Sequence, residues 1–302
     1  WLNLEGISSG EMGAALKVHL GSEAKSLSAN TVSRFKGEWA KEYDGLRAAD
    51  LDDEPVGCIR ADGVHSGLRG ENDKLCALVI VGVTARGQKR LLAIEDGVRA
   101  PKQSWREVLL SLKSCGMNAT KRTTGDGAMG FWAAVDEVYP EARQQRCWQH
   151  KTMNVLNCLA KLFQPKAKAA IHNIWQAENK VDAEKAFNLF IETYESKYPK
   201  AALCLQKDRI ERMAFLDFPV QHWQSIRISN PIEPAFATIR HRIKRSKGRL
   251  SRDDLRHMMF KLGQCAEQNW RKLSGFVCLT KVISGVTFKG GIETADPDQI
   301  AA

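Results

Sequence analysis

Three acidic residues are candidates for a shared catalytic site. They are Asp62 in VGCIRADGV, Asp126 in TTGDG and Glu233 in SNPIEPAF. Carboxylates that share a site repel each other unless a cation holds them, and oxygen ligands are what Mg²⁺ or Mn²⁺ accept. Two such ions about 3.5–4 Å apart would activate a water or a 3′-hydroxyl and stabilise the leaving oxygen of a phosphodiester displacement. The three carboxylates are therefore a candidate catalytic and metal-binding set, provided that the fold brings them together.

Each acid also has a purely structural explanation. An Asp followed by Gly is common in turns, which accounts for Asp62 and Asp126. The segment from Asn230 to Glu233 is similar to a capping box, with Asn at the N-cap, Pro231 at N1 and Glu at N3 of a helix. Capping and metal binding are compatible, so Asn230 is expected to support the site.

A strongly basic segment follows Glu233. Between Pro234 and Lys272 there are eleven Lys or Arg residues against three acids, a balance of 11 − 3 = +8. Such a face can simply be solvated, but its concentration in one segment favours binding to a polyanion, of which nucleic acid is the first candidate. The residues expected to contact phosphate are Arg240, Arg242, Lys244, Arg245, Lys247 and Arg249.

Composition narrows the class of protein. The 302 residues carry a net charge of +10, and they contain neither an apolar window long enough to span a membrane nor a signal peptide. The eight cysteines form no Cys-x-x-Cys pair, which suits a reducing compartment. The sequence therefore predicts a soluble, cytoplasmic protein, and its start at Trp1 suggests a fragment of a longer product.

Residues 1–50 predict two helices and a turn. The second helix begins near Ser28 and has Val32, Phe35 and Trp39 as an expected core stripe. A helix-turn-helix that reads DNA is one interpretation, and a plain packing hairpin is the other, because this region has a balance of 6 − 7 = −1. In the first interpretation the residues that face DNA are Asn30, Thr31, Arg34 and Lys36.

From Pro55 the pattern predicts a mixed α/β layer. Three apolar runs separated by Gly-bearing turns indicate an antiparallel meander, in which Asp62 closes the first strand. A helix (SWREVLLSLKSCG), a short strand ending at Thr124, a second helix (FWAAVDEVY) and a strand-like ARQQRCW follow. If the first strand is central, Asp126 at the end of the fourth can meet Asp62.

Residues 151–222 predict helices only, since apolar stripes at helical spacing recur between prolines. The chain thus divides into an N-terminal helical region at 1–50, a first core part at 55–150 and an all-helical insertion at 151–222. A last core part with the basic helix at 223–290 and a flexible tail at 291–302 complete it.

The whole chain from about Gly6 to Phe288 resembles the transposases of the Mutator superfamily found in bacterial insertion sequences. The matching segments, which occur in order, are ADGVHSGLRGENDKLCALVIVGV, TTGDGAMGFWAAVDEVYPEARQQRCWQHKTMNVL, FPVQHW and SNPIEPAFATIRHR. This resemblance implies a ribonuclease-H-like core interrupted by a helical insertion, and a DDE triad that falls on Asp62, Asp126 and Glu233.

The resemblance also implies the chemistry and the partners. Two Mg²⁺ or Mn²⁺ ions would support the cutting of DNA at element ends and its joining to target DNA. The substrates would be double-stranded terminal inverted repeats and target DNA. The protein would act as a homodimer or a larger assembly at the bacterial nucleoid. It further places Cys147 and His150 near the active site. On their own, a Cys and a His at this spacing are half of a zinc site, but no second pair follows at a finger-like interval.

Two alternatives to a DNA transposase remain at this stage. One is a nuclease of the same fold that cleaves without joining. The other is a non-catalytic DNA-binding protein descended from a transposase, which is favoured by Pro234 directly after Glu233 and by the polar strand KRTT before Asp126. A proline pushes the residue before it away from helical geometry and could misplace the third acid.

Overall fold

The computed structural model describes residues 29–53, 55–67, 74–97, 102–118, 120–126, 129–228 and 251–294. A five-stranded mixed sheet in the order β3-β2-β1-β4-β5 forms its centre. β1 pairs antiparallel with β2 and β2 with β3, whereas β4 pairs parallel with both β1 and β5. The strands are β1 Val56–Gly67, β2 Lys74–Thr84, β3 Lys89–Gly97, β4 Arg122–Gly125 and β5 Arg143–Arg146.

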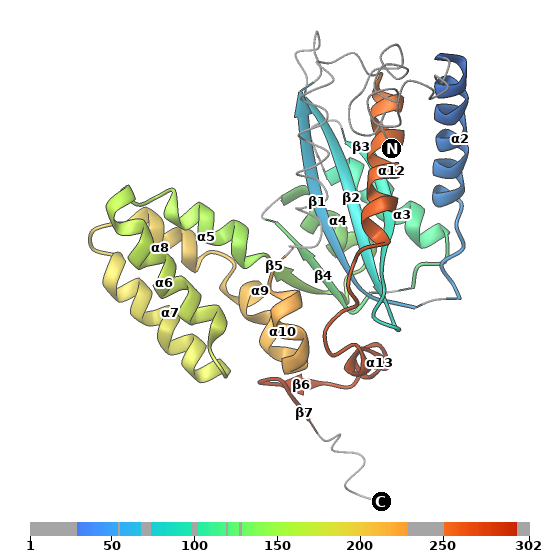
Figure 1. Cartoon of the computed structure of the whole chain (residues 1–302). Coiled ribbons are helices and arrows are strands. Elements are labelled where there is room, and N and C mark those ends of the chain that lie inside the picture. The colour runs from blue at the N-terminus through green and yellow to red at the C-terminus, as the bar shows by residue number, and fades with distance from the viewer. Residues whose placement is uncertain are drawn as a thin grey trace, which may run out of the picture.

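Helices cover both faces of the sheet (Figure 1). One face packs on α3 (Lys102–Ser114) and α4 (Met129–Val138), and the other on α2 (Ala29–Arg47) and α12 (Arg252–Glu267). The meander, the two helices that follow it and the central place of the first strand are confirmed. The α/β class predicted for the chain is therefore right.

The short strand β4 is buried although it is polar. Arg122 is 2% exposed, and Thr123 and Thr124 are fully buried, because β1 and β5 flank the strand on both sides. The Arg122 guanidinium lies 4.9 Å from the ring of Phe218, so an aromatic face shields part of this charge.

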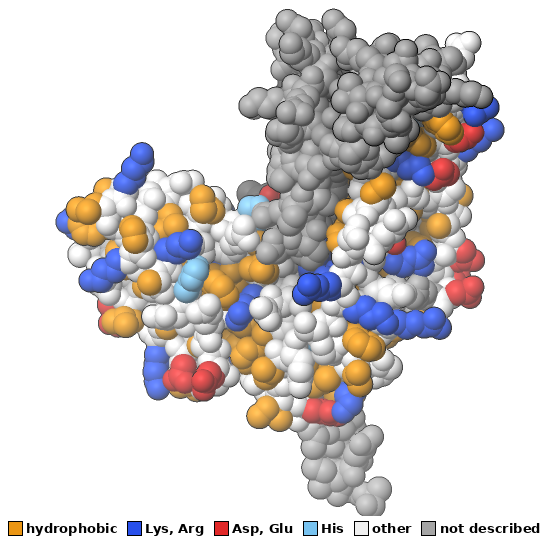
Figure 2. Space-filling model, viewed as in Figure 1, with side chains coloured by type: hydrophobic (Ala, Val, Ile, Leu, Met, Phe, Trp, Pro, Cys, Tyr) orange, Lys and Arg blue, Asp and Glu red, His pale blue; other side chains and the backbone are white. Residues whose placement is uncertain are grey.

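Basic side chains are widely distributed over the surface. On the face shown in Figure 2, Lys and Arg side chains lie on both halves of the molecule, and Asp and Glu side chains lie among them and along the edges. Across the described ranges, none of the helices combines the length and the apolar character that a membrane crossing requires.

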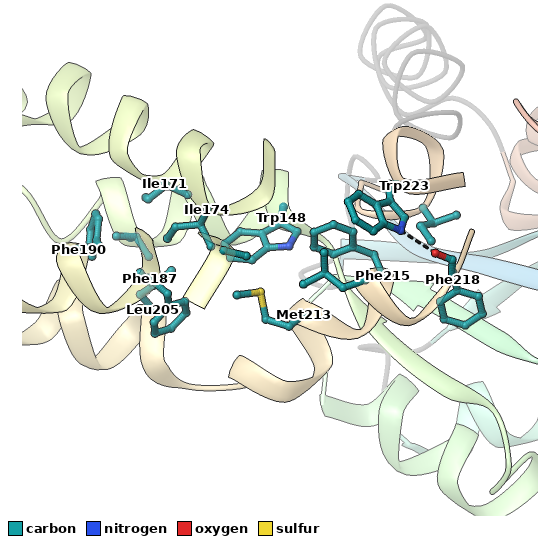
Figure 3. Packing of buried hydrophobic residues seen from close by; sticks show 14 of the residues in the cluster. Trp148, Ile171, Ile174, Phe187, Phe190, Leu205, Met213, Phe215, Phe218 and Trp223 are labelled. Atoms are coloured by element: carbon teal, nitrogen blue, oxygen red, sulfur yellow. Dashed lines mark hydrogen bonds between the residues drawn. The ribbon is translucent and has the colours of Figure 1, made fainter. Parts of the chain in front are cut away.

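From Trp148 to Ile226 the chain is helical, and its buried side chains form one apolar cluster together with residues of β1, β2 and the C-terminal part. Figure 3 shows Trp148, Ile171, Phe187 and Phe190 packed between these helices, and a complete burial of side chains of this size stabilises the fold by about 1.5–3 kcal/mol each. The helices are α5 Trp148–Leu156, η1 Lys161–Phe163, α6 Gln164–Gln176, α7 Lys180–Tyr194, α8 Pro199–Gln206, α9 Arg209–Met213, η2 Ala214–Asp217 and α10 Val220–Ile226.

The helix α2 differs from its predicted packing. Its apolar contact with the sheet and α12 is made by Trp39, Tyr43 and Leu46, with Tyr43 only 2% exposed. Phe35 was expected in the core stripe but is 39% exposed, because the helix meets its neighbours through its second half. The first predicted helix of this region lies outside the described residues.

The C-terminal part closes the fold near α10. The short helix α13 (Val277–Ile283) contacts β1, and a two-stranded sheet follows it, formed by β6 (Phe288–Lys289) and β7 (Ile292–Glu293). β7 falls inside the range predicted as a flexible tail, and the residues from 295 onwards lie outside the described ranges. Gly275 has a φ of 68°, and a Cβ there would lie 2.3 Å from Cβ of Gln221, so this contact with α10 requires glycine.

His222 ties α10 to this C-terminal part and makes the stability depend on pH. Its Nε2 donates to the carbonyl oxygen of Gly275 at 2.9 Å, and the side chain is 1% exposed. Burial lowers the pKa of His222 to about 4, against the hydrogen bond to Gly275, which raises it. The unfolded chain therefore takes up a proton as the pH falls below about 6.5, while the folded chain does so only near pH 4.

We expect the contribution of His222 to be complete above pH 6.5 and to be lost progressively from there towards pH 4. Between pH 7 and pH 5 this amounts to about 2 kcal/mol of unfolding free energy. Urea denaturation of the parent and of His222→Gln, whose amide can also donate to Gly275, measures it. An equally steep loss of stability in the variant would show that His222 is not the titrating group.

Candidate active site

The pairing of β1 with β4 brings two of the three predicted carboxylates together. Arg60 of β1 lies opposite Thr124 of β4 in a parallel register. Continued by two residues, this register places Asp126, which directly follows β4, level with Asp62. The expectation that the first and fourth strands are neighbours is confirmed, and their register supports the prediction that the two acids meet.

The position of Asp62 within its strand differs from the prediction. Asp62 was expected to close the first strand, but β1 continues to Gly67 and Asp62 lies in its middle, paired with Val79 of β2. The following Gly63 is a strand residue and not part of a turn. Asp62 nevertheless lies near the end of β4, because β4 is only 4 residues long and stops at Gly125. The Asp62 side chain is 8% exposed.

The electrostatics of neighbouring groups show that both carboxylates act on one region. The pKa of His150 is raised to about 9, chiefly by a hydrogen bond with Cys147 and also by the negative charges of Cys147, Asp62 and Asp126, against the opposing effect of burial. Burial raises the pKa of the Cys76 thiol to about 11, and Asp96, Asp62 and Asp126 add to this shift. The two carboxylates thus create a negative potential that favours a cation.

Cys147 and His150 lie at this same edge of the sheet. The backbone N–H of Cys147 donates to the carbonyl oxygen of Gly125 at 2.9 Å, and the side chain is 2% exposed. His150 is within hydrogen-bonding reach of Cys147 on the first turn of α5. Their role as support for an active site stays a prediction.

No zinc site is formed by the part of the chain that the structure describes. Within the seven described ranges, no three side chains of His, Cys, Asp or Glu are close enough together to hold a metal ion. The third predicted metal ligand, Glu233, lies outside those ranges, as does Asn230. Within the described ranges, the candidate metal ligands are the carboxylates of Asp62 and Asp126. Their oxygens match the ligand preference of Mg²⁺ or Mn²⁺.

The chain that leads to Glu233 is anchored beside these carboxylates. The N–H of Trp148, at the start of α5, donates to the carbonyl oxygen of Arg227 at 2.9 Å. On β1, Arg60 donates through Nη2 to the carbonyl oxygen of Ser225 at 2.6 Å. Glu233 follows Arg227 by only six residues, a length of chain that spans at most about 20 Å.

Arg227 is itself fixed against the helical part. Its Nη1 donates to the carbonyl oxygen of Trp175 at 2.5 Å, and its guanidinium lies 4.4 Å from the centre of the Trp175 ring. This stacking explains Trp175 as a structural partner of an arginine. The helical part therefore helps to determine where the segment towards Glu233 starts.

The predicted DNA-facing residues on α2 are placed as follows. Asn30 is exposed and Thr31 is half-buried, and Arg34 lies 3.9 Å from Glu38 on the same helix. Lys36 pairs with Asp254 of α12 at 3.4 Å and so lies against that helix. The residues predicted in the basic segment, which are Arg240, Arg242, Lys244, Arg245, Lys247 and Arg249, lie outside the described ranges.

A cluster of buried cations at the end of β5 was not found from the sequence. Asp208, between α8 and α9, lies 3.8 Å from Arg146, 3.8 Å from Lys151 and 3.3 Å from Arg212. The side chains of Lys151 and Arg212 are 5% and 4% exposed. Burial, with Arg212 as the next cause, lowers the pKa of Lys151 to about 8. Asp208 and Arg212 are four residues apart, but no spacing pattern joins Asp208 to Arg146 or Lys151, because it lies more than fifty positions after both in the chain.

Comparison with known proteins gives a consistent result. A family model described as Transposase, Mutator family matches residues 2–270. The chain is 45% identical over 282 residues to the transposase for insertion sequence element IST2 of Acidithiobacillus ferrooxidans, covering 93% of this chain and 95% of that protein. It is 40% identical over 290 residues to the transposase for insertion sequence element IS6120 of Mycolicibacterium smegmatis, covering 96% and 90%.

The cation cluster leads to a prediction about stability. We expect Asp208→Asn to lower the unfolding free energy by about 3 kcal/mol, because it removes the shared negative partner of cations that are buried. Asn keeps the shape of the side chain and tolerates the left-handed backbone of this residue, which has a φ of 62°. Urea denaturation measures the loss.

Asp217→Asn is the matched control. It breaks the ion pair with Arg143, whose side chain is 53% exposed, and we expect less than about 1 kcal/mol from an exposed pair. Equal losses in the two variants would contradict the view that Asp208 balances buried charge.

Proposed function

The chain belongs to the Mutator family of transposases, and we propose that it cuts DNA at the ends of an insertion sequence and joins the freed 3′-hydroxyl to target DNA. The observation that carries this proposal is the parallel register of β1 and β4, which, continued by two residues, supports a close approach of Asp62 and Asp126. We propose Glu233 as the third carboxylate.

We also propose that the core is of the ribonuclease-H-like kind. This rests on the strand order β3-β2-β1-β4-β5, with an antiparallel meander followed by two parallel strands and with β1 in the centre. In such a sheet a central strand and its parallel neighbour can present acids to one substrate. The helical part from α5 to α10 then enters the core after its fifth strand.

We propose that Asp62, Asp126 and Glu233 hold two divalent metal ions, either Mg²⁺ or Mn²⁺. Bound there, the metal would supply charge stabilisation for an in-line phosphodiester displacement. The chain itself provides one carboxylate on β1 and one directly after β4, and both of these strands have a neighbouring strand on each side. Rigid strands hold such ligands more accurately than loops.

The proposed substrate is double-stranded DNA, namely the terminal inverted repeats and the target. The net charge of +10 and the excess of cations between Pro234 and Lys272 support a polyanionic partner. Arg240, Arg242, Lys244, Arg245, Lys247 and Arg249 are proposed to contact phosphate, together with the exposed polar face of α2. Joining two DNA ends calls for two active sites, so we propose a homodimer or a larger assembly on DNA.

The carboxylates give the first test of this function. We expect Asp62→Asn, Asp126→Asn and Glu233→Gln each to abolish Mn²⁺-dependent cleavage of labelled element-end DNA while end binding stays within about twofold, since the charge that holds metal is removed but the fold is kept. Asp136→Asn, at an exposed position of α4, is the control and should cleave like the parent.

The same assay separates the alternative functions. Cleavage by the parent without transfer of the 3′-hydroxyl to a target would indicate a nuclease. Binding of ends without any cleavage would indicate a non-catalytic DNA-binding protein, and Pro234→Ser would then be expected to restore activity if the proline misplaces Glu233. Retained cleavage in all three carboxylate variants would refute the site.

The basic segment gives a second test. Replacing Arg240, Arg242 and Lys244 together by Ala should weaken binding to any DNA sequence and reduce the slope of log affinity against log salt by roughly 0.9 for each phosphate that is no longer neutralised. Fluorescence anisotropy over a range of NaCl concentrations measures this slope. An unchanged slope would mean that these side chains form a solvated face and do not touch the phosphate backbone.

A further inference from the structure

Trp132 of α4 contacts the backbone of one of the proposed catalytic residues. Its Nε1–H donates to the carbonyl oxygen of Asp126 at 2.8 Å, and the side chain is 3% exposed. The hydrogen bond is made to the backbone carbonyl group of Asp126 and not to its carboxylate. This part-buried hydrogen bond restrains the backbone of the residue that follows β4.

The ring of Trp132 belongs to a cluster of packed aromatic side chains. Phe131 and Trp132 pack edge to face with centroids 4.9 Å apart, and Trp105 packs in the same way on Phe131 at 5.0 Å. Gly125, directly before Asp126, allows this close approach: a Cβ there would lie 3.2 Å from both Phe131 and Trp132. The indole therefore has little freedom to move away from Asp126.

A cation from the neighbouring strand also lies on this ring. The guanidinium of Arg146 lies 4.6 Å from the ring of Trp132, and Arg146 is the β5 residue paired with Gly125. A guanidinium on an aromatic face is attractive, and more so where water is excluded. The side chain of Arg146 is only 13% exposed.

Arg146 is in turn held by Asp208 from the helical part. Nη2 of Arg146 lies 3.8 Å from Oδ1 of Asp208. Among the residues described, Asp208 is the one non-glycine residue with a positive φ, a conformation that costs free energy and persists where its surroundings impose it. Contacts therefore run without interruption from the helical part through Arg146 and Trp132 to Asp126.

We propose that Trp132 is a positioning residue, which fixes Asp126 for metal binding and is itself held in place by Arg146 and Asp208. A ligand carboxylate must be held within about 0.5 Å of its productive place, and the hydrogen bond to the Asp126 carbonyl provides that restraint. The positioning of a metal ligand rests on the proposed function, whereas the restraint of the Asp126 backbone does not.

The test compares Trp132→Phe with Trp105→Phe. The first variant keeps an aromatic ring beside Arg146 but removes the N–H that reaches Asp126. The second is a matched control, because Trp105 is 1% exposed in the same aromatic cluster and its Nε1 has no hydrogen-bond partner. Both variants lose the bulk of an indole, and only one loses a bond to the site.

Two measurements are made on both variants. Hydrogen exchange of the amides around Asp126 should be at least about fivefold faster in Trp132→Phe than in the control, as expected for the loss of one hydrogen bond. The Mn²⁺ concentration that gives half-maximal cleavage of element-end DNA should rise by a similar factor in Trp132→Phe alone. A general loss of stability would change both variants together.

A second variant covers the case in which Trp132→Phe folds poorly. Arg146→Gln leaves the indole N–H in place but removes the cation from its ring, and we expect faster exchange around Asp126 by a smaller factor. Equal exchange in Trp132→Phe, Arg146→Gln and the control would overturn the proposal. A parent that exchanges as expected but cleaves no DNA would refute the proposed function and leave the restraint of Asp126 established.

Discussion

The parallel pairing of β4 with β1 is the constraint on which the candidate site depends. Antiparallel strands can be joined by a short hairpin, whereas parallel neighbours need a crossover, which here contains α3. This crossover brings residues far apart in the chain to the same level, so that Asp126 lies beside Asp62. A shift of the register by one residue would turn one of the carboxylates to the opposite face of the sheet.

The helical part is joined to the sheet through polar contacts as well as through the apolar cluster that it shares with Cys58 of β1 and Val83 of β2. Arg60 reaches Ser225, Trp148 reaches Arg227, and Arg146 reaches Asp208. Burying so many cations is costly unless each is paired or hydrogen-bonded, and a well-packed apolar contact would often be at least as stable. The polar contacts are directional, however, and they fix the position of the helical part relative to the carboxylates. This arrangement suits the proposed function, in which the helices help to place a third acid and a DNA substrate.

The sequence predicted the core well where local patterns determine it. The apolar runs of the meander and the periodicity of α3 and α4 correspond to the observed elements, because burial on the sheet selects these residue types. The predicted end of β1 was wrong. Asp62 followed by Gly63 has the pattern of a turn, but eleven residues of β2 pair with this strand, and the strand continues to Gly67. Strand length is set by the partner strand, which a local pattern does not contain.

The buried polar groups show the same limit. Arg122 and the two threonines of β4 are too polar for a core strand by composition, and only the flanking strands and the Phe218 ring account for their burial. The Asp208 cluster and the contact of Trp132 with Asp126 depend on tertiary packing, so no spacing in the sequence indicates them. The meeting of Asp62 with Asp126 could be predicted because each acid lies on or directly after a recognisable strand.

The central claim is that the fold gathers Asp62, Asp126 and Glu233 around divalent metal. Crystals of the protein on element-end DNA, grown with Mn²⁺, test it directly through the anomalous scattering of manganese. Anomalous peaks are expected within about 2.2 Å of carboxylate oxygens from all three residues, the distance typical of a small divalent ion bound by oxygen. Peaks elsewhere, or a Glu233 carboxylate that is remote from an ion held by the two aspartates, would contradict it.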